Sequence, residues 1–267
     1  MISFVGAGPG AIDLITLRGA QRLAAADIVI WASSLVPPEL LEHCRPGTQI
    51  HDSKTMTLED VLDVYLANAA ATIVRLHSGD PSIYGAIAEQ IDWCRDNDRP
   101  FEIVPGVTSV SAAAAVLGRE LTVPTLSQSV ITTRLAGRTK ASMPAGEGVT
   151  AMAPHGATMA VFLAGARPDE LVEELLAPGS GYRDSTPAAV LVRATWPDEQ
   201  VVRTTVAGLP HAIRSTGATM TLLVVVGDVL AERTVPARSH LYNPTYTTAY
   251  RLRSEQGSTA GRPSRSS

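Results

Sequence analysis

The first block able to do chemistry is Val5-Gly-Ala-Gly-Pro-Gly-Ala11, between an apolar run and a helical pattern. Glycines at this spacing let a pyrophosphate approach the backbone at a helix N-terminus, as in the dinucleotide fingerprint G-x-G-x-x-G/A. That fingerprint also needs an acidic residue at the end of the second strand, whereas Asp27 precedes the strand expected at 28–31. Pro9 also removes one backbone N–H from the loop. The block therefore favours a different cofactor or substrate, with phosphate binding and a purely structural turn as the alternatives.

Two further blocks repeat the order of strand, turn and helix. In His77-Ser-Gly-Asp-Pro-Ser-Ile-Tyr-Gly85, Gly79 allows close approach of a ligand, and the Asp80 carboxylate can accept hydrogen bonds from it. In Val104-Pro-Gly-Val-Thr-Ser109, two hydroxyl residues stand at the start of a predicted helix. These side chains are equally suited to capping their helices, so each block alone leaves a structural role open.

The elements that must position these blocks alternate through the first 120 residues. Short β-rich runs predict strands at 2–5, 28–31, 72–77 and 101–104, and longer patterns predict helices at 12–25, 57–70, 82–96 and 109–118. Thr57 and Asp60 have the spacing of a capping box. The alternation predicts an α/β domain on a largely parallel sheet. Ligands bind beyond the carboxyl ends of such strands, so the three blocks are expected at one edge.

The pattern changes after Pro124. Apolar runs predict strands at 128–133, 158–163, 188–193, 201–206 and 219–226, two of them joined by a hairpin-like connection at 194–200. Helices are expected at 169–176 and 209–215, and 137–154 reads as a Gly/Pro-rich loop. We therefore predict two α/β domains, 1–120 with a mostly parallel sheet and 125–250 with a mixed sheet. Residues 254–267 are predicted to be a disordered tail.

The composition excludes several classes of protein. Of 267 residues, 45% are apolar and 18% charged, which is typical of a globular protein. A net charge of −4 and an aromatic content of 4% disfavour a nucleic-acid partner. Two cysteines in unrelated contexts form neither a disulfide framework nor a zinc motif, and no metal is predicted. No run is long enough to cross a membrane and no signal-peptide pattern opens the chain, which predicts a cytoplasmic protein.

Together the three blocks resemble the signatures of the tetrapyrrole (uroporphyrin-III C/precorrin) methyltransferase family. Residues 5–18 are similar to its N-terminal signature throughout, including Pro9 and Thr16, which a dinucleotide fingerprint does not require. The blocks at 79–85 and 105–109 resemble the next two signatures in the right order, and the resemblance covers about residues 1–250. The missing acid disfavours an NAD- or FAD-dependent oxidoreductase, and three ordered signatures disfavour a non-catalytic ligand-binding protein.

The resemblance implies a homodimer that holds S-adenosylmethionine in a cleft between its two domains. Carried over position by position, it implies cofactor contacts from Pro9, Gly79, Asp80, Ile83, Thr108 and Ser109, and from Ala164, Ala194, Met220 and Thr221 in the second domain. Related members often have Met where Ala164 stands and Gly where Ala194 stands, a departure that backbone contacts would tolerate.

The runs at 31–36, 77–90 and 196–199 are similar to the branch of the family that methylates C11 of precorrin-4 in cobalamin biosynthesis. Methylation of another corrin carbon stays open. So does a cobalt-loaded substrate, because the cobalt would arrive inside the tetrapyrrole and need no protein ligand.

The implied substrate carries several carboxylates, which arginine can bind in a bidentate way. We expect Arg134, Arg138 and Arg193 to hold it, with solvated faces or structural ion pairs as the alternative. The other candidate substrate contacts are His77, Tyr84 and His155. A sulfonium methyl is already electrophilic, so positioning suffices and no catalytic residue is named. If a proton must move, the two histidines are the candidates.

Overall fold

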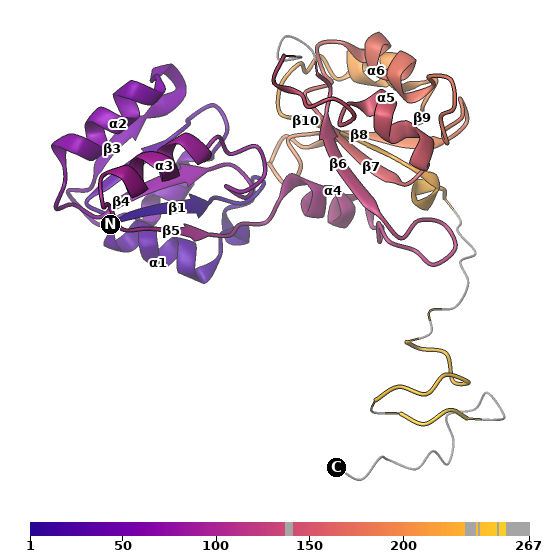
Figure 1. Ribbon diagram of the computed structural model, residues 1–267, viewed down its shortest axis with the longest axis horizontal. Coiled ribbons are helices and arrows are strands. Elements are labelled where there is room, and N and C mark those ends of the chain that lie inside the picture. Colours follow the sequence, from indigo (N-terminus) through magenta and orange to yellow (C-terminus); the bar gives the residue numbers. More distant parts are fainter. Residues whose placement is uncertain (137–140, 233–238, 240, 250, 255–267) are drawn as a thin grey trace.

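The computed structural model describes residues 1–136, 141–232, 239, 241–249 and 251–254. Two α/β bodies lie side by side, each built on a five-stranded sheet, and the chain crosses between them just before α4 (Ser109–Leu117) (Figure 1). The expected fold class is confirmed. The predicted tail after Ser254 lies outside the described residues.

The first sheet is parallel throughout, in the order β3-β2-β4-β1-β5. Its strands are β1 (Ile2–Gly6), β2 (Ile28–Trp31), β3 (Gln49–Asp52), β4 (Ile73–His77) and β5 (Phe101–Val104). Residues of α1 (Leu17–Ala25) pack in the core on one face, and residues of α2 (Leu58–Ala67) and α3 (Ala88–Asp96) pack in the core on the other. Because both faces are covered, β1 is buried along its whole length, and its one polar side chain, Ser3, donates to Glu102.

Several local predictions in this domain are confirmed, and others need correction. The capping box exists: Thr57 accepts a hydrogen bond from the Asp60 amide, and Asp60 accepts one from the Thr57 amide. Strand β3 was not expected, because it is a half-exposed edge strand without an apolar alternation. The helix predicted at 82–96 begins only at Ala88, because Tyr84 and Ala86 adopt left-handed backbone conformations that a helix cannot contain.

The second sheet is mixed, as expected, in the order β6-β7-β10-β8-β9. Its strands are β6 (Val130–Arg134), β7 (Thr158–Phe162), β8 (Pro187–Val192), β9 (Gln200–Thr205) and β10 (Leu222–Val226), with only β6 and β7 parallel. One face packs against α5 (Val149–Met152), α6 (Pro168–Leu175) and α7 (Leu209–Ser215). Helix α5 and the 3-10 turn Ala153–His155 lie where the sequence predicted a loop.

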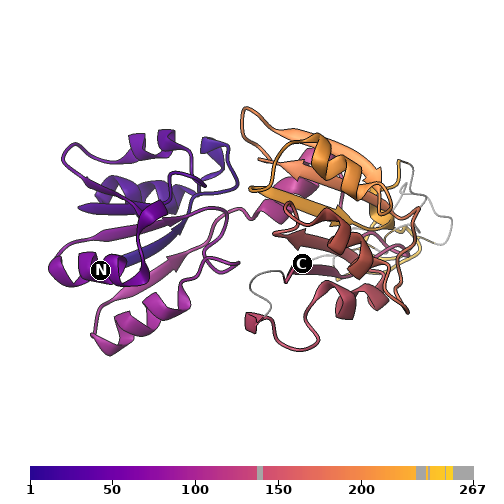
Figure 2. The same cartoon turned by 90° about the horizontal axis from the view of Figure 1, so that it is seen from above.

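Helix α4 covers the other face of this second sheet. Its Ala113 and Leu117 share one core with Ala160 of β7, Leu191 of β8 and Val225 of β10. Figure 2 also shows α4 beside the second body. The sequence placed this helix in the first domain, ending at 120; the packing favours a boundary before it, near the end of β5. No helix among the described residues is both long and apolar enough to span a bilayer.

Candidate active site

The three glycine blocks meet at one edge of the first sheet, where β1, β4 and β5 end side by side. Gly8 and Gly79 pair across the first two blocks, with N–O distances of 3.2 and 2.8 Å, and both adopt left-handed φ angles of 81° and 63°. The third block approaches as closely: a Cβ on Gly106 would lie 2.1 Å from the Gly79 carbonyl oxygen. Only glycine fits there, so these glycines join the loops to one another.

Asp80 joins the second block to the third. One of its carboxylate oxygens accepts a hydrogen bond from the Gly106 amide and the other from the Ser82 amide, each at 2.8 Å. Asp80 therefore does not cap a helix, since none begins at that point. Thr108 does have the capping role that its block allowed, because its hydroxyl accepts the Ser111 amide at the start of α4.

The facing edge of the second sheet contains four strained non-glycine residues beside the closely packed Gly165. Leu163 follows β7, Arg193 and Thr195 follow β8, and Thr221 precedes β10. Their φ angles are 58°, 50°, 69° and 55°, in that order. Non-glycine residues hold such conformations at a cost of about 1–3 kcal/mol each, and they gather at ligand sites. Four of them at one sheet edge mark it as functional.

Between the two edges lies a cavity of about 340 Å³. The expected cofactor residues that line it are Pro9, Ser109, Ala194, Met220 and Thr221. Two others lie directly beside its lining: Gly79 follows Ser78, and Ala164 stands between Leu163 and Gly165. Asp80, Ile83 and Thr108 do not line it. Leu163 and Met220, 63% and 77% exposed, present apolar surface at this cavity.

A second contact joins the domains beside this cavity. The Trp196 indole Nε1 donates to the Pro9 carbonyl at 2.9 Å, and the Ala11 amide donates to the Thr195 hydroxyl at 2.9 Å. The Arg193 guanidinium stacks over the Trp196 ring at 4.0 Å and forms an ion pair with Asp198 at 2.8 Å. The sequence analysis used 196–199 only for the family resemblance. It did not predict that this segment joins the two domains. Arg193 is therefore already paired, which argues against its expected role as a free carboxylate clamp.

Arg134 and Tyr84 line a cavity of about 350 Å³ beside the same edge. Arg134 ends β6, and its guanidinium donates to the Ser142 hydroxyl at 2.9 Å. Tyr84 reaches across from the first domain, where its ring meets the Phe162 ring edge-on at 5.2 Å between centroids. Burial raises the pKa of the Tyr84 phenol, and nearby Arg134 opposes that shift. A guanidinium, a phenol and the Glu147 carboxylate thus share a cavity directly beside the first one.

Comparison with known proteins identifies the family. Residues 1–210 match the family model of the Tetrapyrrole (Corrin/Porphyrin) Methylases. The chain belongs to this family. It is similar to the cobalt-precorrin-4 C(11)-methyltransferase of Methanocaldococcus jannaschii, with 43% identity covering 94% of this chain and 95% of the relative. It is also similar to the precorrin-4 C(11)-methyltransferase of Rhodococcus erythropolis, with 43% identity covering 91% and 97%.

Solved structures agree with the family. The X-ray structure of a cobalt precorrin-4 methyltransferase matches with a TM-score of 0.81 and 40% identity, covering 86% of this chain and 95% of that one. A uroporphyrin-III C-methyl transferase from Thermus thermophilus, crystallised with S-adenosyl homocysteine, matches with a TM-score of 0.69 and 25% identity, covering 86% and 98%.

Two residues expected to meet the tetrapyrrole, His77 and His155, line neither of these two cavities. His77 lies buried at the end of β4, where desolvation, and to a lesser degree nearby Arg75, lower its pKa to about 3. It is neutral at physiological pH and too weak a base to move a proton efficiently. His155 precedes the N-terminal end of β7, the opposite end from the cleft, which argues against a role at the substrate. Arg138 lies outside the described residues.

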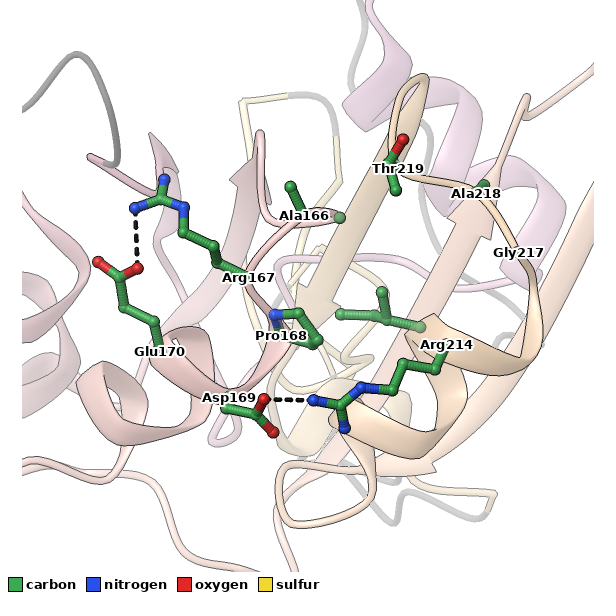
Figure 3. Close-up of a pocket in the computed structure, with 11 residues that line it drawn as sticks. Ala166, Arg167, Pro168, Asp169, Glu170, Arg214, Gly217, Ala218 and Thr219 are labelled. Carbon is green, nitrogen blue, oxygen red and sulfur yellow. Dashed lines mark hydrogen bonds and ion pairs between the residues drawn. The ribbon is translucent and has the colours of Figure 1, made fainter.

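Another cavity of the methylase, of about 490 Å³, lies behind the cofactor-side wall and shares Gly165 and Thr219 with the first. Figure 3 shows its two arginines, each engaged by a carboxylate: Arg167 by Glu170 and Arg214 by Asp169. The paired charges leave it no net attraction for an anionic substrate. Among the residues that the structure describes, no three His, Cys, Asp or Glu side chains are grouped as a metal site.

Proposed function

We propose that the chain transfers a methyl group from S-adenosylmethionine to C11 of precorrin-4, or of cobalt-precorrin-4, in cobalamin biosynthesis. The observation that carries this proposal is the cavity of about 340 Å³ between the glycine edge of the first sheet and the strained edge of the second. It is lined by five of the ten positions that the family resemblance assigns to the cofactor, in a chain similar to C11-methyltransferases along nearly its whole length.

The apolar side chains and the backbone groups of the lining suit S-adenosylmethionine. Exposed Leu163 and Met220 offer apolar surface to an adenosine ring, and Thr221 and Ala194 bring backbone groups to the same wall. Pro9 of the first domain and Ser109 at the start of α4 close the other side. Asp80 does not line this cavity and accepts two backbone amides, so we assign it to holding the loops in place.

The bound cofactor supplies an electrophilic methyl group on a sulfonium, and the tetrapyrrole carbon supplies the electrons of the new bond. The chain must therefore orient the two reactants and exclude water. The docked 193–199 loop fixes the distance between the domains, with Trp196 bonded to the Pro9 carbonyl. With His77 held neutral and His155 remote, positioning accounts for the catalysis without a protein base.

For the tetrapyrrole we propose the cavity beside Arg134 and Tyr84, because a guanidinium there can bind the acetate or propionate carboxylates of the substrate. Arg134→Ala is expected to raise the KM for the tetrapyrrole about tenfold while the affinity for S-adenosylhomocysteine stays unchanged. The matched control is Arg214→Ala, which removes an exposed, carboxylate-paired arginine elsewhere in the same domain. Equal KM values in the two variants would contradict this substrate site.

The family resemblance also predicts a homodimer, which light scattering of the purified protein measures. The deciding experiment is calorimetric titration with S-adenosylhomocysteine, with NAD and FAD as parallel controls. We expect micromolar binding of S-adenosylhomocysteine alone. Turnover of precorrin-4 and cobalt-precorrin-4, followed by mass spectrometry for one added methyl group, then identifies the substrate. Binding of NAD or FAD instead of S-adenosylhomocysteine by the folded protein would overturn the proposal.

A further inference from the structure

The turn that carries Tyr84 into the cleft is strained. Tyr84 and Ala86 have φ angles of 57° and 51°, and between them Gly85 lies so close to Pro81 that a Cβ would approach its carbonyl oxygen to 2.0 Å. Side-chain-bearing residues hold the left-handed region only where their surroundings fix them there. Something in the first domain must therefore hold the turn at 82–87 in this conformation.

Two buried polar side chains behind the turn provide that restraint. The Gln90 side-chain amide, in α3, donates to the Ala86 carbonyl at 3.0 Å, and its oxygen accepts from the Tyr65 hydroxyl of α2 at 2.7 Å. Tyr65 is completely buried and Gln90 is 5% exposed. Because the Ala86 carbonyl can only accept, the amide NH₂ must face it, so the amide oxygen faces Tyr65 and the phenol must donate. Burial raises the pKa of Tyr65, which keeps that proton in place.

The restrained turn matters because of where Tyr84 stands. Its ring contacts Phe162, which lines the cavity proposed for the cofactor, while Tyr84 itself lines the cavity beside Arg134. Tyr84 therefore separates the two proposed binding cavities. Movement of the turn would displace the Tyr84 wall of the cavity beside Arg134, while Phe162 in β7 would remain at the other cavity.

We propose that Tyr65 and Gln90 are positioning residues for methyl transfer: their hydrogen-bond relay holds the 82–87 turn so that Tyr84 stays against Phe162 at the tetrapyrrole side of the cleft. The proposal rests on the function proposed above for the identity of the two ligands. Releasing the turn disorders the tetrapyrrole side and leaves the cofactor lining of Leu163, Met220 and Thr221 in place.

The test is Tyr65→Phe, which removes only the donating hydroxyl. The matched control is Tyr182→Phe: Tyr182 is also buried, and its hydroxyl also donates to a carbonyl, that of Ala157 at 2.6 Å, beside the end of β7 remote from the cleft. Hydrogen–deuterium exchange measures how fast the amides of 82–87 exchange, and urea unfolding measures global stability. Steady-state kinetics give the KM for the tetrapyrrole, and calorimetry gives the Kd for S-adenosylhomocysteine. Gln90→Leu interrupts the same relay at its second member.

We expect Tyr65→Phe and Gln90→Leu to speed exchange in 82–87 about tenfold and to raise KM about fivefold, with Kd within twofold of the original protein. Tyr182→Phe should change neither exchange in 82–87 nor KM. Equal exchange in the Tyr65 and Tyr182 variants would overturn the relay, and faster exchange with unchanged KM would overturn its positioning role. If the original protein methylates neither tetrapyrrole, the function proposed above has failed, whereas exchange still decides the relay.

Discussion

The two edges that form the cleft fix their backbones in different ways, although the 82–87 turn of the first domain also holds two left-handed residues, Tyr84 and Ala86. On the first sheet the loops approach one another through glycines, with Gly8 paired to Gly79 and Gly106 packed on the Gly79 carbonyl. On the second sheet, side-chain-bearing residues such as Leu163 and Thr221 take the left-handed conformations themselves. At the first edge a Cβ on Gly6 or Gly106 would clash with backbone, while at the second edge several residues with side chains bear strain and Gly165 also packs closely, against Thr219.

The difference separates two ways of building a binding surface. A glycine edge gains close backbone contact and loses side chains, so it can serve as a fixed support. A strained edge keeps side chains at positions where a ligand can meet them, and exposed Leu163 and Met220 are examples. Structural changes should therefore be destructive at the first edge and tolerable, or even stabilising, at the second.

The largest effect is expected for Gly106→Ala. The new Cβ would lie 2.1 Å from the Gly79 oxygen, and Gly79 is already fixed by its pairing with Gly8. We expect the free energy of unfolding to fall by about 3 kcal/mol or more, measured by urea denaturation. Gly148→Ala is the control, since Gly148 has open space and an ordinary φ of −67°. A loss below about 1 kcal/mol would show that the first edge can yield, and the contrast would fail.

Asp80→Ala tests the carboxylate that ties the glycine edge together. It leaves the Gly106 and Ser82 amides without their acceptor, which should cost about 2–3 kcal/mol of stability. Affinity for S-adenosylhomocysteine, measured by calorimetry, should fall with it, because the loops carrying Pro9 and Ser109 lose their link. Asp80→Asn keeps one accepting oxygen, so it should lose less stability and less affinity for S-adenosylhomocysteine. Unchanged affinity in the alanine variant would separate this link from the binding site.

The loss of stability at low pH is expected to depend on His77 in the first domain and not on His155 in the second. Folded His77 stays neutral down to about pH 3, whereas the unfolded chain takes up that proton near its ordinary pKa of 6.5. The unfolded state binds more protons between these values, so stability falls as the pH falls, by about 2 kcal/mol from pH 7 to pH 5. Urea unfolding at both pH values should show this loss reduced in His77→Gln and retained in His155→Gln. The same loss in both variants would contradict the assignment to His77.

The smallest effect is expected for Thr221→Gly. Glycine relieves the left-handed strain at a φ of 55°, so stability measured by thermal or urea unfolding should rise by about 1 kcal/mol. Affinity for S-adenosylhomocysteine should fall, because the cavity loses a lining side chain and a fixed backbone. Gly217→Ala makes the opposite change, because it puts a side chain on a residue with a φ of 68°, and it should lower the stability of the protein. Lower stability in Thr221→Gly would remove the argument that this edge stores strain.

The sequence by itself determined the two sheets and the glycine edge. Apolar runs marked β1, β2, β4 and β5 to within a residue or two, since buried parallel strands are continuous in apolar residues. Glycine and proline indicate tight turns by residue type. The three blocks that contain them could therefore be predicted to form one site at the edge of the sheet. The half-exposed strand β3 and short helix α5 carried too weak a pattern to be found.

Only the tertiary structure decided the second edge and the contacts across the cleft. Nothing in the types Leu163, Arg193 or Thr221 indicates a left-handed backbone, because it is imposed by neighbouring strands rather than preferred by the residue. The same holds for Trp196 on the Pro9 carbonyl and for Tyr65 behind the 82–87 turn. Local preferences act over a few residues, whereas these contacts join positions 187 and 25 residues apart, and packing alone brings them together.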